Sequence, residues 1–254
     1  MTTLTLGIKT SHGWQLKQID ELLKSEFEEL DVDLKVLGNT INRWVQVELS
    51  GEDQAIATSF VKNKIGTCPV NLENAKELGT MKGYIFNVDG NKNEIRVDVG
   101  ILQPRVIQAT LSLKTLQDQL LKGEKFDLKK LSEYFALVGG LPIEVQLEVT
   151  DSEEELPAEL SAKEIQRLNS WRMSLLDRLI IFGATKESIE MVLKRTKLNR
   201  DIIDIEEFGL FVHALTCKLG TDAAGLIPKI GRYMRYSIFA LFRAKRFLDM
   251  INKN

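Results

Sequence analysis

The chain has 254 residues, of which 44% are hydrophobic and 28% charged, and its formal net charge is −2. This composition excludes a disordered or fibrous protein, and the length allows one large domain or two to three small ones. A charge this close to neutral excludes a general cationic coat of the kind that binds duplex DNA, so any nucleic-acid surface must be local.

The N-terminal segment and the two cysteines indicate the compartment. Met1–Thr10 has no basic region followed by an apolar run, so no signal peptide is predicted. No stretch approaches the roughly 18 consecutive apolar residues of a membrane span, which predicts no membrane partner. Because Cys68 and Cys217 lie far apart in the chain, we expect a cytoplasmic protein without a disulfide framework.

In chain order, residues 1–72 predict a small module in the order strand, helix, strand, strand, helix. Thr5, Gly7 and Lys9 alternate with leucine and isoleucine, as in a half-buried strand. This order predicts a small antiparallel sheet with its helices on one face. The elements expected after the first strand are Trp14–Leu30, Asp33–Leu37, Arg43–Leu49 and Glu52–Lys64.

Residues 79–150 change to a pattern of strands and predict an OB-like β-barrel. Gly90–Asn93 joins two alternating runs and is a hairpin signal. We interpret Asp151–Glu155 as an acidic, solvated linker. The expected strands are Lys82–Asp89, Glu94–Val99, Arg105–Leu111 and Pro142–Val149, with helical or loop segments at Leu116–Leu121 and Leu128–Leu137.

Residues 161–254 predict a C-terminal α+β module that ends in a long basic helix. Ser161 and Glu164 form a capping box, and Thr185 can cap the next helix. The order of residues 1–72 is repeated here, either through a distant duplication or because two unrelated units share it. The expected elements are a helix to Leu176, Leu179–Phe182, Lys186–Arg195, Ile202–Ile205, Leu210–Cys217, a glycine-rich turn, Gly225–Ile230 and the terminal helix. The whole chain is thus expected to be α+β, with three modules.

Two segments of the central module resemble a known family. Gly83–Asp89 and Ile95–Gly100 resemble the opening strands of the OB-fold RNA-binding domain that is repeated in the large bacterial small-subunit ribosomal protein. Leu121–Phe126 is similar to that family's entry into its closing strand, here Leu141–Val149. The chain departs from the family pattern in the polar turn Gly90–Asn93 and in the inserted segment Leu128–Leu137. The resemblance implies a barrel that binds RNA.

The whole chain also resembles a family of uncharacterised archaeal proteins. The resemblance is carried by Phe182–Thr185 and above all by Cys217–Gly231. It implies an archaeal host and a cytoplasmic protein, and it implies no mechanism.

Three groups of residues were weighed as sites for small ligands or chemistry. Gly220, Thr221 and Gly225 have the glycine spacing of a phosphate loop but lack its following Lys and Ser or Thr, so they form either a structural turn or a backbone site for an anion. His213 and Cys217 are two potential ligands where zinc needs four, and a buried role is expected for both. Asp204 and Glu206 share a strand face, as surface charges or as a carboxylate site. We therefore predict no metal, no cofactor and no enzymatic activity.

The candidate RNA-binding residues form two sets. In the barrel, alternation places Tyr84 and Phe86 on one strand face, which suits base stacking, although two aromatic residues there also fit a core. At the C-terminus, basic residues at helical spacing form a stripe beside the apolar helix face Ile238–Ile251, or they complement the helix dipole. The cations of the barrel are Lys82, Lys92 and Arg96, and those of the C-terminus are Lys229, Arg232, Arg235, Arg243, Arg246 and Lys253.

These features together predict a non-catalytic protein that binds RNA or a ribonucleoprotein such as the ribosome. The alternative from another class is a protein–protein adapter whose apolar terminal helix docks on a partner. A weaker alternative is an enzyme whose site assembles from loops that the sequence does not connect.

Overall fold

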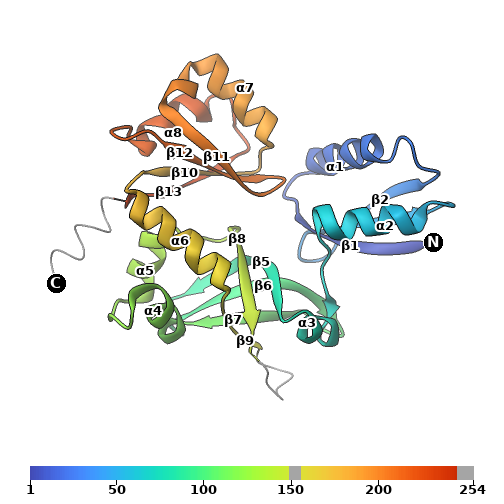
Figure 1. The fold of residues 1–254 in the computed structure, drawn as a ribbon, viewed down its shortest axis with the longest axis horizontal. Coiled ribbons are helices and arrows are strands. Elements are labelled where there is room, and N and C mark those ends of the chain that lie inside the picture. Colours follow the sequence, from blue (N-terminus) through green and yellow to red (C-terminus); the bar gives the residue numbers. More distant parts are fainter. Residues whose placement is uncertain (149–155, 245–254) are drawn as a thin grey trace. The chain divides into compact units, whose positions relative to one another are not determined.

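The computed structural model describes residues 1–148 and 156–244 (Figure 1). The chain forms two compact units, the first made of Met1–Glu77 with Gly100–Val106, and the second made of Leu78–Val99 with the chain from Ile107 onward. None of the described helices is long and apolar enough to cross a membrane.

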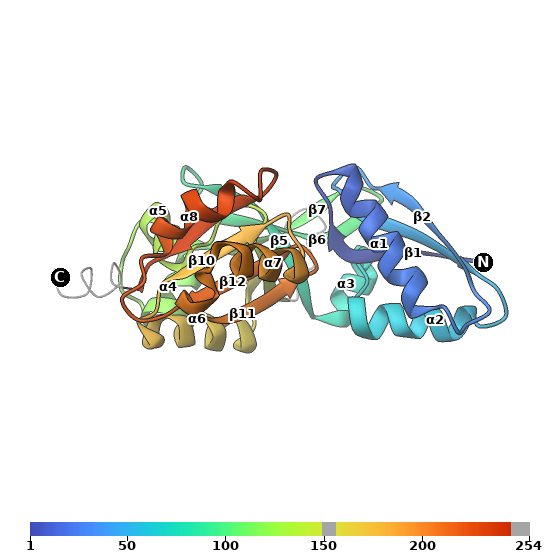
Figure 2. The same cartoon turned by 90° about the horizontal axis from the view of Figure 1, so that it is seen from above.

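The first unit contains a three-stranded antiparallel sheet with β3 in the centre between β1 and β2. Both views show α1 and α2 on the same face of this sheet (Figures 1 and 2). Leu6, Val47 and Leu49 of the strands are buried there with Ile19 and Leu23 of α1. The elements are β1 Thr2–Lys9, α1 Gly13–Glu26, β2 Asp33–Asn39, β3 Trp44–Ser50, α2 Gln54–Phe60, β4 Val70–Asn71 and α3 Leu72–Leu78. The predicted order of strands and helices is confirmed.

The second unit begins with a closed five-stranded barrel. Its strands are joined in the cyclic order β5-β6-β7-β9-β8, because β6 also pairs with β7 and β5 with β8. The third and fifth strands of the barrel, β7 and β9, run parallel, and the helices lie between the third and fourth strands. This is the OB-like barrel expected from the sequence. The elements are β5 Thr80–Asp89, β6 Glu94–Gln103, β7 Ile107–Ser112, α4 Leu113–Leu121, α5 Leu128–Phe135, β8 Pro142–Leu147 and β9 Leu156–Leu160.

The closing strand β9 was not predicted. Its alternation of buried Leu156, Ala158 and Leu160 covers only five residues and includes Pro157. The proline is tolerated because it lies next to the start of β9, before the residues Ala158–Leu160 that pair with β8. The predicted linker Asp151–Glu155 lies outside the described residues.

The C-terminal part of the second unit is a four-stranded antiparallel sheet in the order β11-β12-β10-β13. Helices α7 and α8 cover one face and α6 the other (Figure 1). Such a βαββαβ order places both helices that follow strands on one side. The elements are α6 Ala162–Ser174, β10 Arg178–Phe182, α7 Lys186–Thr196, β11 Ile202–Gly209, β12 Val212–Cys217, α8 Ala223–Gly231 and β13 Ile238–Phe242.

The long basic terminal helix is wrong over its described part. Ile238–Phe242 is strand β13, paired residue by residue with β10 from Ile238 opposite Phe182 to Phe242 opposite Arg178. Aromatic and β-branched residues favour a strand where a sheet edge is open to them, and the edge of β10 supplies that partner. The predicted helical stripe therefore does not exist over these residues, and Arg246 and Lys253 lie outside the described residues.

Candidate nucleic-acid interface

Phe86 is turned outward by a β-bulge in β5. Ile85 pairs with Val97 and Asn87 with Arg96, so Phe86 is an extra residue between two consecutive pairs. A bulge re-aims side chains because two residues of one strand oppose one of the other. As a result, Phe86 is 57% exposed whereas the preceding Ile85 is buried.

The exposed Phe86 lines a groove of about 500 Å³ between β5 and α5. We call it the Phe86 groove. Leu137 and Val138 add apolar surface, whereas Asn87, Lys129 and Glu133 supply polar and charged groups. An aromatic ring beside an amide and an ammonium group can stack an unpaired base, bond its edge and contact a phosphate.

A second exposed aromatic cluster follows α8. We call Arg232–Tyr236 the arginine–tyrosine segment, because arginine and tyrosine recur there around Met234. Tyr233 is 46% exposed and Tyr236 70%, whereas Met234 is buried in the core beneath α7 and α8. The guanidinium carbon of Arg195 lies 4.6 Å from the centre of the Tyr233 ring. The buried Met234 thus anchors a segment that presents both rings to solvent.

Two glycine contacts connect the arginine–tyrosine segment to the Phe86 groove. A β-carbon at Gly140, next to Gly139 of the groove, would lie 3.8 Å from Cδ1 of Phe182. A β-carbon at Gly183 would lie 3.3 Å from the Tyr236 carbonyl oxygen, closer than ordinary packing allows. Gly183 also has a φ of +90°, which disfavours any other residue. These contacts place the backbone of Tyr236 near the end of the Phe86 groove at Gly139, within the second unit.

The charge along this part of the chain favours an anionic ligand. Between Ala223 and Ala244 the sequence has four basic residues and no acidic one. Lys229, Arg232 and Arg235 are exposed, and so is Lys92 in the turn after β5. Exposed cations beside exposed rings are the combination that binds single-stranded nucleic acid.

Lys82 and Tyr84 do not join this surface. The Lys82 ammonium group donates a hydrogen bond of 2.9 Å to the carbonyl oxygen of Phe208 in β11. Tyr84 is 9% exposed, and its hydroxyl oxygen lies 3.6 Å from the position of a β-carbon at Gly209. Both side chains face the C-terminal sheet, which covers this side of the barrel. The prediction that Tyr84 lies with Phe86 on an exposed face of the barrel is therefore wrong.

Arg96 and Arg243 also differ from the other predicted cations. Arg96 lies opposite Asn87, but its Nε donates a 2.9 Å hydrogen bond to Glu94, which partly neutralises it. Arg243 follows the far end of β13, beyond Phe242. At about 3.3 Å per residue, the strand separates it from Tyr236 by roughly 15 Å or more. The structure thus groups Arg232 and Arg235 with the aromatic residues and leaves Arg243 apart.

The predicted anion-binding turn is occupied by an acidic side chain. Asp222 caps α8, and its Oδ1 accepts a 3.0 Å hydrogen bond from the Ala224 amide. A carboxylate at this position repels an incoming anion and takes up a backbone donor. Gly220, with a φ of +88°, forms the turn, whereas Gly225 lies inside α8 rather than in a loop. The structural interpretation of Gly220, Thr221 and Gly225 is therefore the better one.

His213 and Cys217 are both buried in β12, facing the core under α7 and α8. Burial raises the pKa of the Cys217 thiol to about 11, with the charge of Asp177 as the second cause. Burial also lowers the pKa of His213. Glu206 accepts hydrogen bonds from Trp171 at 2.8 Å and from Arg178 at 3.1 Å, so it is part of the packing of α6. Among residues 1–148 and 156–244, no three His, Cys, Asp or Glu side chains are placed to hold a metal ion.

Four residues of this surface were not predicted from the sequence: Tyr233, Tyr236, Arg195 and Lys129. A signal for the tyrosines was present, because arginine followed by tyrosine recurs three residues apart in Arg232–Tyr236. The predicted helix obscured this signal, because the spacing of the arginines alone defined the exposed face of that helix. Arg195 and Lys129 depend on tertiary packing and had no local signal.

Three family models match the chain, and together they cover most of it. They are described as the DUF2110 N-terminal domain, matched by residues 9–71, the DUF2110 central domain, matched by residues 75–172, and the DUF2110 C-terminal domain, matched by residues 176–242. No curated protein matches the chain.

Proposed function

We propose that this chain, which belongs to the DUF2110 family, binds single-stranded RNA. The observation that carries the proposal is the arginine–tyrosine segment. Its two tyrosine rings are exposed, and each tyrosine directly follows an exposed arginine, in a stretch of chain that has no acidic residue. An aromatic ring that faces water gains free energy when it is covered, and stacking on a nucleobase covers it.

Unpaired bases suit this surface better than a duplex does. A ring can stack only on a base whose face is accessible, and the bases of a duplex are stacked on each other. The Phe86 groove supplies a third ring next to the segment, with Lys129 at its wall. A strand that crosses both sites would place bases on Phe86, Tyr233 and Tyr236, and its phosphates near Arg232 and Arg235.

The proposal extends to the setting of the protein. We propose that the central OB-like barrel is related to the OB-fold RNA-binding domain of the large ribosomal protein of the bacterial small subunit. A ribonucleoprotein such as the ribosome is then the expected partner. We place the chain in the cytoplasm of an archaeal host, a setting that suits the free cysteines Cys68 and Cys217.

We also propose that the protein acts as a binding module rather than as an enzyme. The high pKa of the buried Cys217 thiol disfavours its use as a nucleophile, since the thiolate is the reactive form. The adapter hypothesis required an amphipathic helix from Ile238 onward. Because Ile238–Phe242 is a strand, that form of the hypothesis is not retained.

Fluorescence anisotropy with a labelled 12-nucleotide oligouridine tests the proposal. Removing one stacking ring is expected to cost about 1–3 kcal/mol, so Tyr236→Ala and Phe86→Ala should each weaken binding by roughly five- to 150-fold. Trp14→Ala is the matched control, because Trp14 is an exposed aromatic residue of the first unit. A duplex RNA of equal length should bind more weakly than the single strand.

The opposite results would be just as informative. If both alanine variants are folded and bind the oligouridine like the wild type, stacking at this surface is excluded. If Trp14→Ala weakens binding as much as Tyr236→Ala does, the binding surface lies elsewhere.

A further inference from the structure

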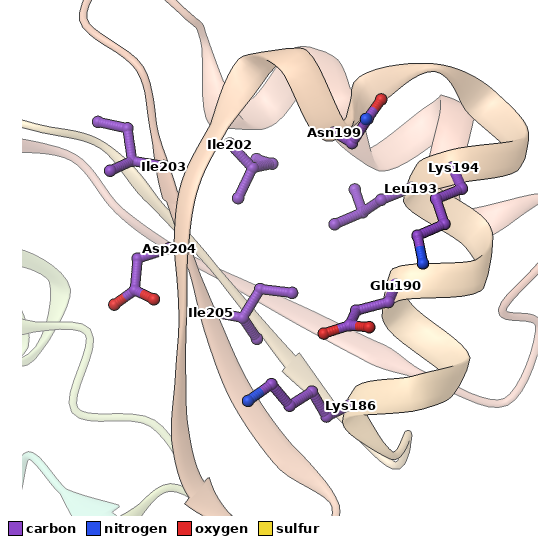
Figure 3. Close-up of a pocket in the computed structure, with 9 residues that line it drawn as sticks. All are labelled: Lys186, Glu190, Leu193, Lys194, Asn199, Ile202, Ile203, Asp204 and Ile205. Atoms are coloured by element: carbon purple, nitrogen blue, oxygen red, sulfur yellow. The ribbon is translucent and has the colours of Figure 1, made fainter.

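Strand β11 is an edge strand with a groove beside it. Of the described strands only β12 pairs with it, so one side of its backbone faces away from the sheet. A groove of about 270 Å³ lies between β11 and α7 (Figure 3). An edge strand beside a helix is a geometry in which an extended peptide can add itself to a sheet.

The part of β11 that can accept a new strand is short and regular. Asp204, Ile205, Glu206 and Glu207 pair consecutively with β12, from Thr216 to His213. Irregularities in register lie just outside this run, between Ile202 and Asp204 and between Glu207 and Gly209. The irregularities at both ends disfavour pairing with a long strand of another molecule. They leave about four residues of β11 that can pair with a short segment.

The groove has an apolar floor and a charged wall. Leu193 of α7 and Ile202 and Ile205 of β11 lie between the helix and the strand (Figure 3). Lys186, Glu190 and Lys194 form the helical wall, with Glu190 between the two lysines. Apolar side chains of an added strand would pack on this floor, as alternate residues do on one face of a sheet.

The opposite side of β11 is acidic. Figure 3 shows Asp204 and Ile203 pointing away from the helix, and both are exposed, Ile203 by 55%. Glu206 belongs to the same side, where it is held by Trp171 and Arg178. Like charges directly opposite each other destabilise a strand pair, so two copies of β11 repel, whereas a strand with basic side chains on this side is attracted.

We infer that β11 and α7 form a docking site for an extended segment of a protein partner, which pairs with Asp204–Glu207 as an added strand. Its side chains alternate between apolar residues, which contact Leu193 and Ile205, and basic residues, which face Asp204. The pairing run of β11 contains no residue of the proposed RNA surface, and neither proposal depends on the other.

The probe for this inference is an acetylated and amidated octapeptide of alternating valine and lysine. It is titrated into the full-length, ¹⁵N-labelled protein, and backbone amide shifts and hydrogen exchange are followed by NMR. We expect shifts centred on Asp204–Glu207 and α7, with slowed exchange of amides in that run of β11. The Asp204→Lys variant should bind the peptide roughly three- to tenfold more weakly. Glu29→Lys, an exposed substitution in the first unit, is the charge-matched control.

Two further peptides separate strand addition from charge attraction. An octapeptide with the same side chains but N-methylated at alternate residues cannot complete the main-chain ladder and should lose binding to β11. Alternating valine and glutamate should bind at least tenfold more weakly than valine and lysine. Equal binding of the N-methylated peptide, or shifts that avoid Asp204–Glu207, would overturn the inference. So would a concentration-dependent dimer that protects the β11 amides without any peptide, because a second copy would then be the occupant.

Discussion

The first sheet of the chain and the last one have the same arrangement but different surfaces. In each, the first strand lies next to the third and the third next to the second, which gives β1-β3-β2 and β10-β12-β11. Strand β13 extends the last sheet beside β10. At the corresponding place beside β1, the described residues form a single bridge, from Leu6 to Thr67. The fourth strand is thus complete in one sheet and rudimentary in the other.

The two sheets also differ in charge. Residues 1–72 contain seven basic and ten acidic residues, whereas residues 176–244 contain eleven basic and eight acidic ones. The exposed arginine–tyrosine segment lies in the second stretch, in the connection from α8 to the strand that the first sheet lacks. One topology therefore carries two different surfaces, which differ in particular side chains rather than in the fold.

The largest expected effect comes from the packing that covers the second face of the last sheet. Trp171 of α6 is 1% exposed and makes edge-to-face contacts with Phe208 and Phe242, at 5.7 and 5.3 Å between ring centres. Trp171→Ala should lower the stability of this sheet by about 3–5 kcal/mol, through lost burial and a cavity.

Hydrogen exchange measured by NMR would localise this effect. Amides of β10 and β12 should exchange faster in Trp171→Ala, whereas those of β1 and β3 should keep their protection. Trp44→Ala, which removes a buried tryptophan from the first sheet, should give the reverse pattern. A uniform loss of protection in both variants would contradict the treatment of the two sheets as separately stabilised.

The next effect is a pH dependence that arises from a buried thiol of the last sheet. Cys217 is fully buried, and its pKa is raised to about 11. In the unfolded chain a thiol has a pKa of about 8.5, so the unfolded state loses its proton first as the pH rises. The stability that the neutral thiol contributes is present below about pH 8.5 and is lost between about pH 8.5 and 11, by roughly 3 kcal/mol.

Denaturant unfolding between pH 8 and 11, followed with amide signals of β12, checks this prediction. Cys217→Ala should flatten the pH dependence relative to the wild type, because the titrating group is removed. Parallel curves for the wild type and Cys217→Ala would show that the thiol does not titrate in this way.

Local patterns predicted most strands and helices, since alternation and capping residues act over a few positions. The Gly90–Asn93 hairpin and the helix cap at Thr185, whose hydroxyl accepts from the Ser188 amide, are examples. The prediction of a helix over Ile238–Phe242, which is strand β13, was wrong because the apolar and basic residues in and around this segment also fit a helical period. The edge of β10 favours the strand over the helix, and its residues lie 56 to 64 positions earlier in the chain than their partners in β13.

The candidate site was predictable only in part for the same reason. Phe86 and Arg232 were recognised from their types and spacing. The bulge that exposes Phe86 depends on pairing with β6, and the burial of Tyr84 depends on the C-terminal sheet, neither of which is visible in a local window. The contact between Gly183 and Tyr236, which joins the two aromatic sites, is likewise a tertiary property.

The measurement that tests the central proposal most directly is the salt dependence of oligouridine binding. Arg232 and Arg235 each directly precede an exposed tyrosine, whereas Arg243 lies beyond the far end of β13. At about 0.7 per phosphate contact on a single strand, the slope of log affinity against log salt should fall by roughly 1.4 in Arg232→Gln/Arg235→Gln. Arg243→Gln should leave the slope unchanged. An unchanged slope in the folded double variant, or an equal loss in Arg243→Gln, would contradict RNA binding by the arginine–tyrosine segment.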